Sequence, residues 1–217
     1  MENEQNTKKN LMDIAVKLFA EKGYDSVGVQ ENCGEAKITK PTLYYYFGSK
    51  AGLLQSIIES AGGNLLDRIR EAAAYTHDFQ NSLTKILKAA ISFALANEKY
   101  FDLHCSLTNA PDGSEASSIF SALKNELELE IQTLFANSCN EFGNMRGKEK
   151  LYALLYQNNV RSVAQAVIRG KIGACEETVY QIVHSFMYGS QTDRHHIRLG
   201  TTFVWPGDAD LRLNQCS

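Results

Sequence analysis

The sequence predicts an all-α fold of one or two domains. Apolar residues recur at helical spacing along most of the 217 residues, 44% of the residues are hydrophobic, and only three are proline. Because proline breaks helices and an amphipathic helix buries one apolar stripe, this composition favours compact helical packing. Nothing in the composition indicates disorder over most of the chain.

The first predicted helix ends near Lys22, and Gly23 follows it as a stop signal. A second short helix is predicted from residue 27 to residue 36. The apolar positions of the first helix follow the i, i+3, i+4, i+7, i+8 pattern of one buried face. They are Leu11, Ile14, Ala15, Leu18 and Phe19.

Residues 38–50 predict a third short helix and the start of a fourth. Thr39 is placed to accept a hydrogen bond from an N–H group of the first turn, and the fixed φ of Pro41 suits that turn. Gly48 then ends the third helix, and Ser49 is a cap for the fourth. The third helix is therefore predicted to run to about residue 47.

This third helix is predicted to have one buried stripe, formed by Leu43 and Phe47, which lie four residues apart. The rest of its surface carries hydroxyl groups and an ammonium group. Three short helices followed by a long one are the layout of a helix-turn-helix module, in which the last short helix enters the major groove of DNA. The polar surface comprises Lys40, Thr42, Tyr44 and Tyr45.

Two blocks of sequence carry a resemblance to a known family: Leu-Phe-Ala-Glu-Lys-Gly-Tyr at 18–24 and Thr-Leu-Tyr-Tyr-Tyr-Phe-Gly-Ser-Lys at 42–50. Over about residues 8–60 the chain resembles the N-terminal domain of TetR-type (TetR/AcrR-like) bacterial transcriptional regulators. The resemblance implies an N-terminal three-helix helix-turn-helix domain followed by a larger helical bundle for ligand binding and dimerisation. It also implies a ligand-responsive repressor that binds a palindromic double-stranded DNA operator as a homodimer.

The resemblance further implies which residues contact DNA. Lys50, at the start of the fourth helix, matches a phosphate-binding position of the family. Lysine and tyrosine side chains suit phosphates, whereas glutamine, threonine and the proline ring suit base edges or a thymine methyl group. The other matching positions are Gln30, Thr39, Lys40, Pro41, Thr42, Tyr44, Tyr45 and Tyr46. We expect Tyr44→Phe and Lys50→Ala to weaken binding to all sequences, and Lys40→Ala to change the preferred sequence.

Three residues depart from the family pattern. Asn32 stands where an aliphatic residue usually faces the core, and an unpartnered buried amide costs about 1–3 kcal/mol. Lys37 replaces the usual glycine of the turn and must tolerate any positive φ there. Gly52 lies inside the fourth helix and is expected to lower its stability by about 1 kcal/mol relative to alanine.

The charge of the chain gives no support to DNA binding by itself, because the formal net charge is −3. The support is local: Lys37, Lys40 and Lys50 lie close in sequence to the third helix, and phosphate contact needs only such a patch. A solvated lysine face is the alternative interpretation.

Beyond the DNA-binding module, residues 110–113 (Ala-Pro-Asp-Gly) and 143–147 are predicted to break the chain into separate helices. The predicted helices cover residues 49–74, 82–96, 100–108, 114–142, 148–169 and 176–189. The last two helices carry more apolar surface than a small helical domain easily buries. By resemblance they form a four-helix dimer interface with a second copy, and the alternative is that both are core of a monomer.

The resemblance implies a pocket for a small-molecule effector among the middle helices. An aromatic cavity with a few polar groups is expected from two short sets of residues at helical spacing, although simple core packing is the alternative for each residue. These candidates are Phe101, His104, Cys105, Tyr152, Tyr156 and Asn159. The identity of the effector stays open.

The sequence divides into a helix-turn-helix domain at 1–48, an effector-binding and dimerisation domain at 49–189, and an atypical tail at 190–217. The tail has no helical period. Three interpretations stay open: a disordered or non-native, frameshifted extension; an added strand-like arm; or a metal-binding pair formed by His195 and His196.

Other classes of protein fit the sequence less well. It contains no Gly-rich phosphate loop, no His-Glu-x-x-His and no Gly-x-Ser-x-Gly, so we expect no catalytic site, no metal site and no cofactor. A helical protein–protein adaptor without DNA binding is the alternative function, but it has no need for Lys-Pro-Thr-Leu-Tyr-Tyr-Tyr after a capped turn.

The expected location is the cytoplasm, without a membrane partner. The first residues, Met-Glu-Asn-Glu-Gln, lack the basic and apolar regions of a signal peptide, and no apolar run reaches the ~20 residues that span a bilayer. Five cysteines share no short metal-ligand spacing, and their odd number argues against a complete disulfide framework. We interpret them as reduced thiols.

Overall fold

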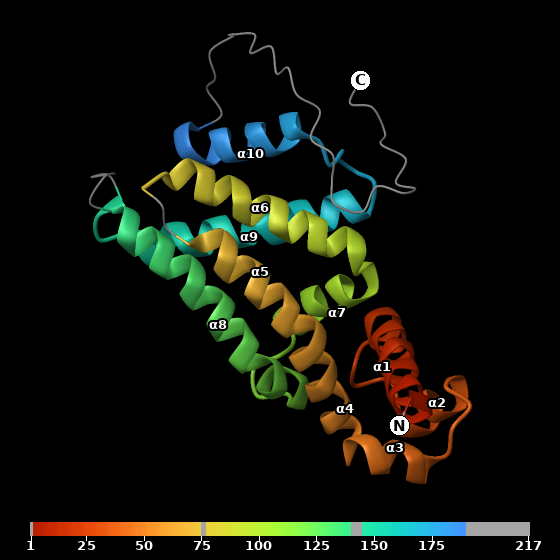
Figure 1. Cartoon of the computed structure of the whole chain (residues 1–217). Coiled ribbons are helices and arrows are strands. Elements are labelled where there is room, and N and C mark those ends of the chain that lie inside the picture. Colours follow the sequence, from red (N-terminus) through yellow and green to blue (C-terminus); the bar gives the residue numbers. More distant parts are fainter. Residues whose placement is uncertain (1, 75–76, 140–144, 190–217) are drawn as a thin grey trace. The chain divides into compact units, whose positions relative to one another are not determined.

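The computed structural model of the chain describes residues 2–74, 77–139 and 145–189. The regular elements in these ranges are all helical, so the predicted all-α fold is confirmed (Figure 1). They are α1 (Glu2–Lys22), α2 (Val29–Glu35), α3 (Lys40–Phe47), α4 (Lys50–Ile57), the π-helical segment η1 (Ile58–Gly62), α5 (Gly63–Ala73), α6 (Phe79–Ala96), α7 (Glu98–Thr108), α8 (Glu115–Ser138), α9 (Glu149–Ile168) and α10 (Glu176–Tyr188).

The helices pack as two compact units. Among the described residues, the first contains those up to Asp67 together with Asn97–Leu127, and the second contains those from Arg68 to Ala96 together with those from Glu128 to 189. Both α5 and α8 begin in the first unit and end in the second. This division follows packing, and the functional boundary after residue 48 stays a prediction.

In the first unit, α1 packs against α2, α4 and α7, and α3 packs against α2 and α4. The predicted apolar stripe of α1 is buried at Leu11, Ala15 and Phe19, each of which is 0% exposed. The edge-to-face contact between Phe19 and Tyr24, with ring centroids 5.1 Å apart, closes the end of this stripe. α1 is therefore the helix around which the predicted helix-turn-helix module is assembled.

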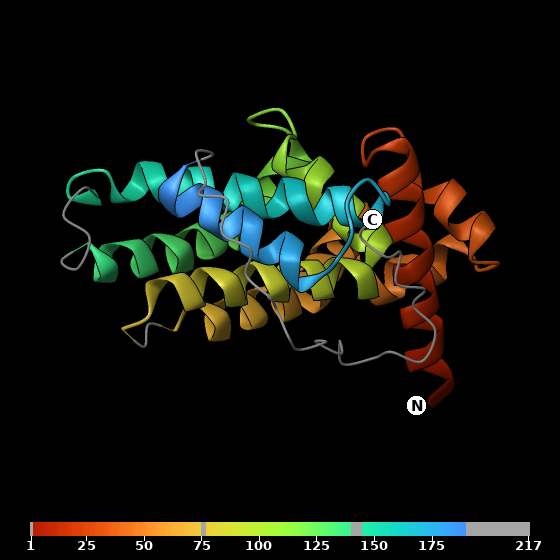
Figure 2. The same ribbon diagram turned by 90° about the horizontal axis from the view of Figure 1, so that it is seen from above.

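In the second unit, α6 packs against both α9 and α10. Figure 1 and Figure 2 show α10 lying over α6 and α9. A cluster of rings fills the space between these helices and α8, and the buried Tyr156 hydroxyl in it donates to the Leu83 carbonyl. The cluster contains Phe79, Phe135, Tyr156 and Phe186.

The helix predicted over residues 49–74 is correct in extent, but it is not one α-helix, because η1 interrupts it. Gly62 ends this π-helical segment at a close approach. A Cβ atom on Gly62 would lie 2.4 Å from Leu123 Cδ2 and 2.6 Å from the Tyr100 hydroxyl. A larger residue at this position would require the ends of the Leu123 and Tyr100 side chains to shift. π-helical segments of this kind rarely show in a sequence pattern.

The remaining predicted helices agree with the structure to within a few residues at each end. The predicted tail at 190–217, with the His195–His196 pair, lies outside the described residues. Within the described ranges, no helix combines the length and apolar character needed to cross a membrane.

Candidate nucleic-acid interface

The ends of α3 are fixed by the caps that the sequence predicts. The Thr42 amide donates to Thr39 Oγ1 at 3.4 Å, and the Gly52 amide donates to Ser49 Oγ at 2.9 Å. Between these two caps, Gly48 ends α3 with a φ of 70°. These contacts fix the lengths of α3 and of the turn into α4.

The two faces of α3 are as different as predicted. Leu43 is 0% exposed and Phe47 is 8% exposed, so both belong to the core. On the other side, Tyr44 is 48% exposed and Tyr45 is 75% exposed. The remaining predicted contact residues are also accessible: Gln30, Thr39, Lys40 and Pro41 are exposed, and Thr42 and Tyr46 are half-buried.

The turn between α2 and α3 adopts the predicted left-handed conformation at Lys37, whose φ is 53°. The Lys37 amide donates to the Gly34 carbonyl at 3.2 Å, and the Ile38 amide donates to the Cys33 carbonyl at 3.0 Å. These two hydrogen bonds stabilise a conformation that a non-glycine residue adopts at some cost. The turn therefore keeps the left-handed geometry that glycine usually provides at this position, and the lysine side chain adds a positive charge.

Asn32 is completely buried, as predicted, but its amide is satisfied on one side. Its Nδ2 donates to the Gly28 carbonyl at 3.1 Å. Its Oδ1 has no hydrogen-bond partner among the described residues. The prediction of an unpartnered amide is therefore correct for the oxygen and wrong for the nitrogen.

Lys50 points into the module. Its Nζ donates to the Tyr24 carbonyl at 3.0 Å and to the Val27 carbonyl at 3.1 Å, and it lies 4.1 Å from the centroid of the Tyr24 ring. Two charge-assisted hydrogen bonds and a cation–π contact thereby join the start of α4 to the loop after α1. The phosphate contact expected of this residue stays a prediction.

Gly52 has a larger role than the sequence indicates. A Cβ atom at this position would lie 1.9 Å from the Phe47 carbonyl oxygen. The expectation that glycine only weakens α4 relative to alanine is therefore wrong. Glycine is required because the last residue of α3 passes over the first turn of α4.

The Tyr24 side chain links the module to α8 within the first unit. Its hydroxyl donates to Glu115 Oε2 in the first turn of α8. Burial first, and then the hydrogen bond to the Glu115 carboxylate, raise the pKa of Tyr24 above its usual range. A second pair, Lys99 Nζ to Glu21 Oε1 at 3.0 Å, joins α7 to the end of α1.

One further lysine near α3 was not among the candidate residues predicted from the sequence. Lys8 Nζ lies 5.6 Å from the centroid of the Phe47 ring. No sequence signal identifies it, since the contact joins residues that are far apart in the chain.

The candidate effector residues are divided between the two units. Phe101, His104 and Cys105 are buried in the first unit. The His104 ring stacks on Phe101 with centroids 5.8 Å apart and meets Phe120 edge-on at 5.1 Å. These contacts are those of a packed core.

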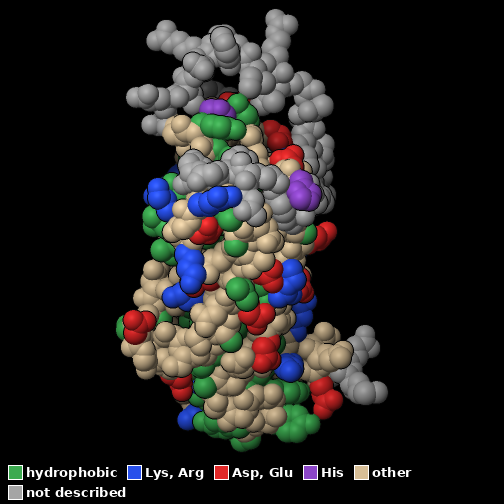
Figure 3. Space-filling model, turned by 90° about the vertical axis from the view of Figure 1, so that its left-hand side faces the viewer, with side chains coloured by type: hydrophobic (Ala, Val, Ile, Leu, Met, Phe, Trp, Pro, Cys, Tyr) green, Lys and Arg blue, Asp and Glu red, His purple; other side chains and the backbone are tan. Residues whose placement is uncertain are grey.

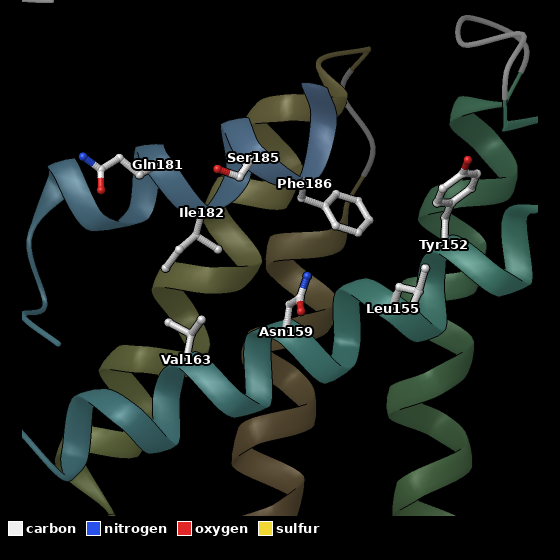
Figure 4. A pocket seen from close by; sticks show the side chains of 8 residues that line it. All are labelled: Tyr152, Leu155, Asn159, Val163, Gln181, Ile182, Ser185 and Phe186. Carbon is white, nitrogen blue, oxygen red and sulfur yellow. The ribbon is translucent and has the colours of Figure 1, made fainter. Parts of the chain in front are cut away.

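The other three candidates belong to the second unit, where Tyr156 is a core residue. Tyr152 and Asn159 line a groove of ≈ 670 Å³ between α9 and α10. Figure 4 shows Val163 of α9 and Ile182 of α10 pointing toward each other across it. The other residues of the groove are Leu155, Gln181, Ser185 and Phe186.

Charged side chains are mixed on the face drawn in Figure 3, where lysine and arginine alternate with aspartate and glutamate. This mixture agrees with the small net charge of −3. Because the net charge gives no overall attraction to DNA, such attraction depends on the local cations around α3.

The comparison with known proteins agrees with this geometry. A family model described as "Bacterial regulatory proteins, tetR family" matches residues 11–57, which comprise most of α1 and all of α2, α3 and α4. Over this N-terminal segment the chain is similar to TetR-type transcriptional regulators. It is 27% identical over 128 residues to the biofilm operon icaADBC HTH-type negative transcriptional regulator IcaR of Staphylococcus epidermidis. That match covers 58% of this chain and 62% of the relative, which is less than two thirds of its length.

Solved structures of TetR-type regulators share the fold. PfmR from Thermus thermophilus superposes with a TM-score of 0.65 at 22% identity, over 84% of this chain and 96% of that one. FadR from Bacillus subtilis, solved in complex with stearoyl-CoA, superposes with a TM-score of 0.67 at 14% identity, over 83% of this chain and 98% of that one. The matched proteins are transcriptional regulators, not enzymes.

Proposed function

We propose that this TetR-type protein is a ligand-responsive repressor that binds a palindromic DNA operator as a homodimer. The observation that carries the proposal is the exposed face of α3, where Tyr44 is 48% and Tyr45 75% exposed beside accessible lysine and threonine side chains. Two caps and the close packing at Gly52 hold that face in one orientation. A helix with a fixed polar surface suits the major groove.

Homodimerisation is proposed from the surface of α9 and α10. Leu151, Leu154 and Leu155 are 53%, 51% and 46% exposed on one side of α9. Together with the adjoining groove they form an apolar face that a second copy would cover, because a two-fold interface pairs a surface with itself. Two recognition helices on a two-fold axis require a palindromic operator.

The response to a small molecule is proposed from the family and from the stearoyl-CoA complex of the Bacillus subtilis neighbour. Tyr152 and Asn159 lie in the groove assigned to the dimer, which leaves Phe101, His104 and Cys105 as the effector candidates. A ligand entering there must displace His104 from between Phe101 and Phe120. Because α1 packs on α7, this displacement would reach the DNA-binding module.

The test is binding to a pool of random duplexes, followed by sequencing of the retained fraction at two salt concentrations. We expect a palindromic motif whose retention falls steeply as salt rises, because lysine–phosphate contacts release counterions. Absence of a motif with weak retention at both salts would contradict the proposal. Capture of protein partners that salt hardly affects would instead favour the adaptor. Stearoyl-CoA is the first effector probe, and release of the selected duplex is the expected result.

A further inference from the structure

The cation that the family resemblance assigns to phosphate is engaged inside the module. Lys50 donates to two backbone carbonyls, at 3.0 and 3.1 Å, and its ammonium lies on the Tyr24 ring. An ammonium group has three donors, so at most one N–H remains for a DNA phosphate. Lys22, at the end of α1, is paired with Glu31. Lys37 and Lys40 stay exposed in the turn before α3 and at its start, and a further exposed cation near the end of α3 would add to backbone binding.

Lys8 occupies a position on α1 that suits this role. It lies three residues before Leu11 and seven before Ala15, so it continues the buried stripe of α1 one turn beyond the core. A lysine at the edge of a core packs its methylene stem on apolar atoms and keeps its ammonium in water. The apolar partner here is the ring of Phe47, with Nζ 5.6 Å from its centroid.

The position of this contact matters because Phe47 is the last residue of α3 and directly precedes the turn into α4. The ammonium of Lys8 is thus held at the end of the recognition helix by a residue 39 positions away in the sequence. A side chain already restrained on a ring loses less conformational entropy when it binds an anion. Glu4, one turn earlier on the same helix, is the nearest acidic residue in sequence with a described side chain.

We propose that Lys8 binds a phosphate of the DNA backbone beside the C-terminal end of α3. This inference rests on the proposed function, and it assigns to α1 a direct contact with the operator in addition to its place in the core. The contact is independent of sequence, because a lysine bound to phosphate carries no information about the bases. Lys8 would thus strengthen binding to every duplex by the same factor.

The test compares Lys8→Met with Lys17→Met, using the duplex selected from the random pool and a scrambled duplex. Lys17 is nine residues further along α1, which places it on the opposite face of the helix, and both lysines are exposed. We expect Lys8→Met to weaken binding several-fold on both duplexes and to lower the slope of log affinity against log salt by about one. Lys17→Met should leave the slope unchanged, and Lys8→Arg should restore it.

The outcomes separate the two proposals. If the wild-type protein binds the selected duplex and Lys8→Met has the wild-type slope, the assignment of Lys8 is wrong and the proposed function stands. If the wild-type protein selects no motif and shows no salt-dependent binding, the proposed function fails and the assignment fails with it. Methionine keeps the apolar part of the lysine side chain, so we expect Lys8→Met to fold as the wild type does. Circular dichroism melting of each variant checks this and excludes unfolding as the cause of a loss of DNA binding.

Discussion

The DNA-binding face of the first unit and the α9–α10 face of the second both expose large side chains, but they are built differently. Tyr44 and Tyr45 stand on a helix that is fixed by caps, a glycine contact and the partly buried hydrogen bonds of Lys50. Leu151 and Leu155 stand on a helix that exposes three leucines at one end, and Leu155 lines an open groove. The first surface has polar groups in a set geometry, as reading DNA requires, and the second has apolar area to bury.

The largest effect is expected from a substitution in the α9–α10 face. Leu155→Glu would place a carboxylate in the groove face of α9, and a two-fold interface contains the change twice. We expect the dimer to weaken by about 3 kcal/mol or more, which is over a hundredfold in the dissociation constant. Sedimentation velocity over a range of concentrations measures it.

Leu129→Glu is the matched control, because Leu129 is 61% exposed on α8 and does not line the groove. It should leave the oligomeric state unchanged. If both variants sediment as the wild type does, the α9–α10 face is not the dimer interface.

The second largest effect is expected from a substitution at Gly52 that disturbs the geometry of α3. Gly52→Ala would place a methyl group 1.9 Å from the Phe47 carbonyl oxygen, so the backbone between α3 and α4 must move. We expect a loss of about 1–3 kcal/mol in unfolding free energy, the usual range for overpacking, and weaker binding to the selected duplex. Thermal melting and duplex titration measure these two changes, and sedimentation should still show the wild-type oligomer.

Gly34→Ala is the control for this change. Gly34 is exposed in α2, and no atom of a neighbouring segment lies within 4 Å of the position that an alanine methyl group would take. Alanine should therefore gain up to about 1 kcal/mol there. Equal melting temperatures for Gly52→Ala and the wild type would show that the α3–α4 junction tolerates displacement.

The features that the sequence predicts correctly are those that one short segment determines. The caps at Thr39 and Ser49, the positive φ of Lys37 and the buried stripe of α3 depend on residues within a few positions of each other. The recognition helix and its exposed residues were therefore predictable. Their contacts with DNA stay predictions.

The contacts that the sequence does not reveal are those that join distant segments. Lys50 reaches carbonyls 23 and 26 residues away, and Gly62 meets side chains of α7 and α8. The candidate effector residues were grouped by helical spacing alone, and they belong to two units; their role in binding an effector stays a prediction. Helical period reports which face a residue occupies, but not which helix covers that face.

The third substitution, Asn32→Leu, is expected to stabilise the first unit. Asn32→Leu keeps the branching of the side chain and removes a buried oxygen that has no partner among the described residues. The Gly28 carbonyl keeps a hydrogen bond in this variant, because it also accepts from the backbone N–H of residue 32 at 3.2 Å. We expect a gain of about 1 kcal/mol in unfolding free energy, measured by urea denaturation.

Asn32→Asp is the control, since it has the same shape and buries a charge. It should be less stable than the wild type at neutral pH. A loss of stability in both variants would mean that the amide nitrogen contributes more than the unpaired oxygen costs.

The smallest effect concerns Tyr24, whose hydroxyl donates to Glu115. Tyr24→Phe keeps the ring against Phe19 and Lys50 and removes this hydrogen bond, so we expect a loss of about 1 kcal/mol at neutral pH. Burial and the Glu115 carboxylate raise the pKa of Tyr24 in the folded protein, and the neutral phenol is therefore the stabilising form. Its contribution is complete below the ordinary tyrosine pKa of about 10 and is lost as the pH rises above that value.

The difference in unfolding free energy between wild type and Tyr24→Phe should accordingly be constant from pH 7 to about 9 and shrink above about pH 10. Burial also raises the pKa of Tyr100 and Tyr156, but both proteins contain these residues, so their effect cancels in the difference. Urea denaturation of the two proteins at matched pH values measures it. A difference that stays constant to about pH 11 would show that Tyr24 ionises no less readily in the folded protein than in the unfolded chain, and the Tyr24–Glu115 contact would then not stabilise the first unit.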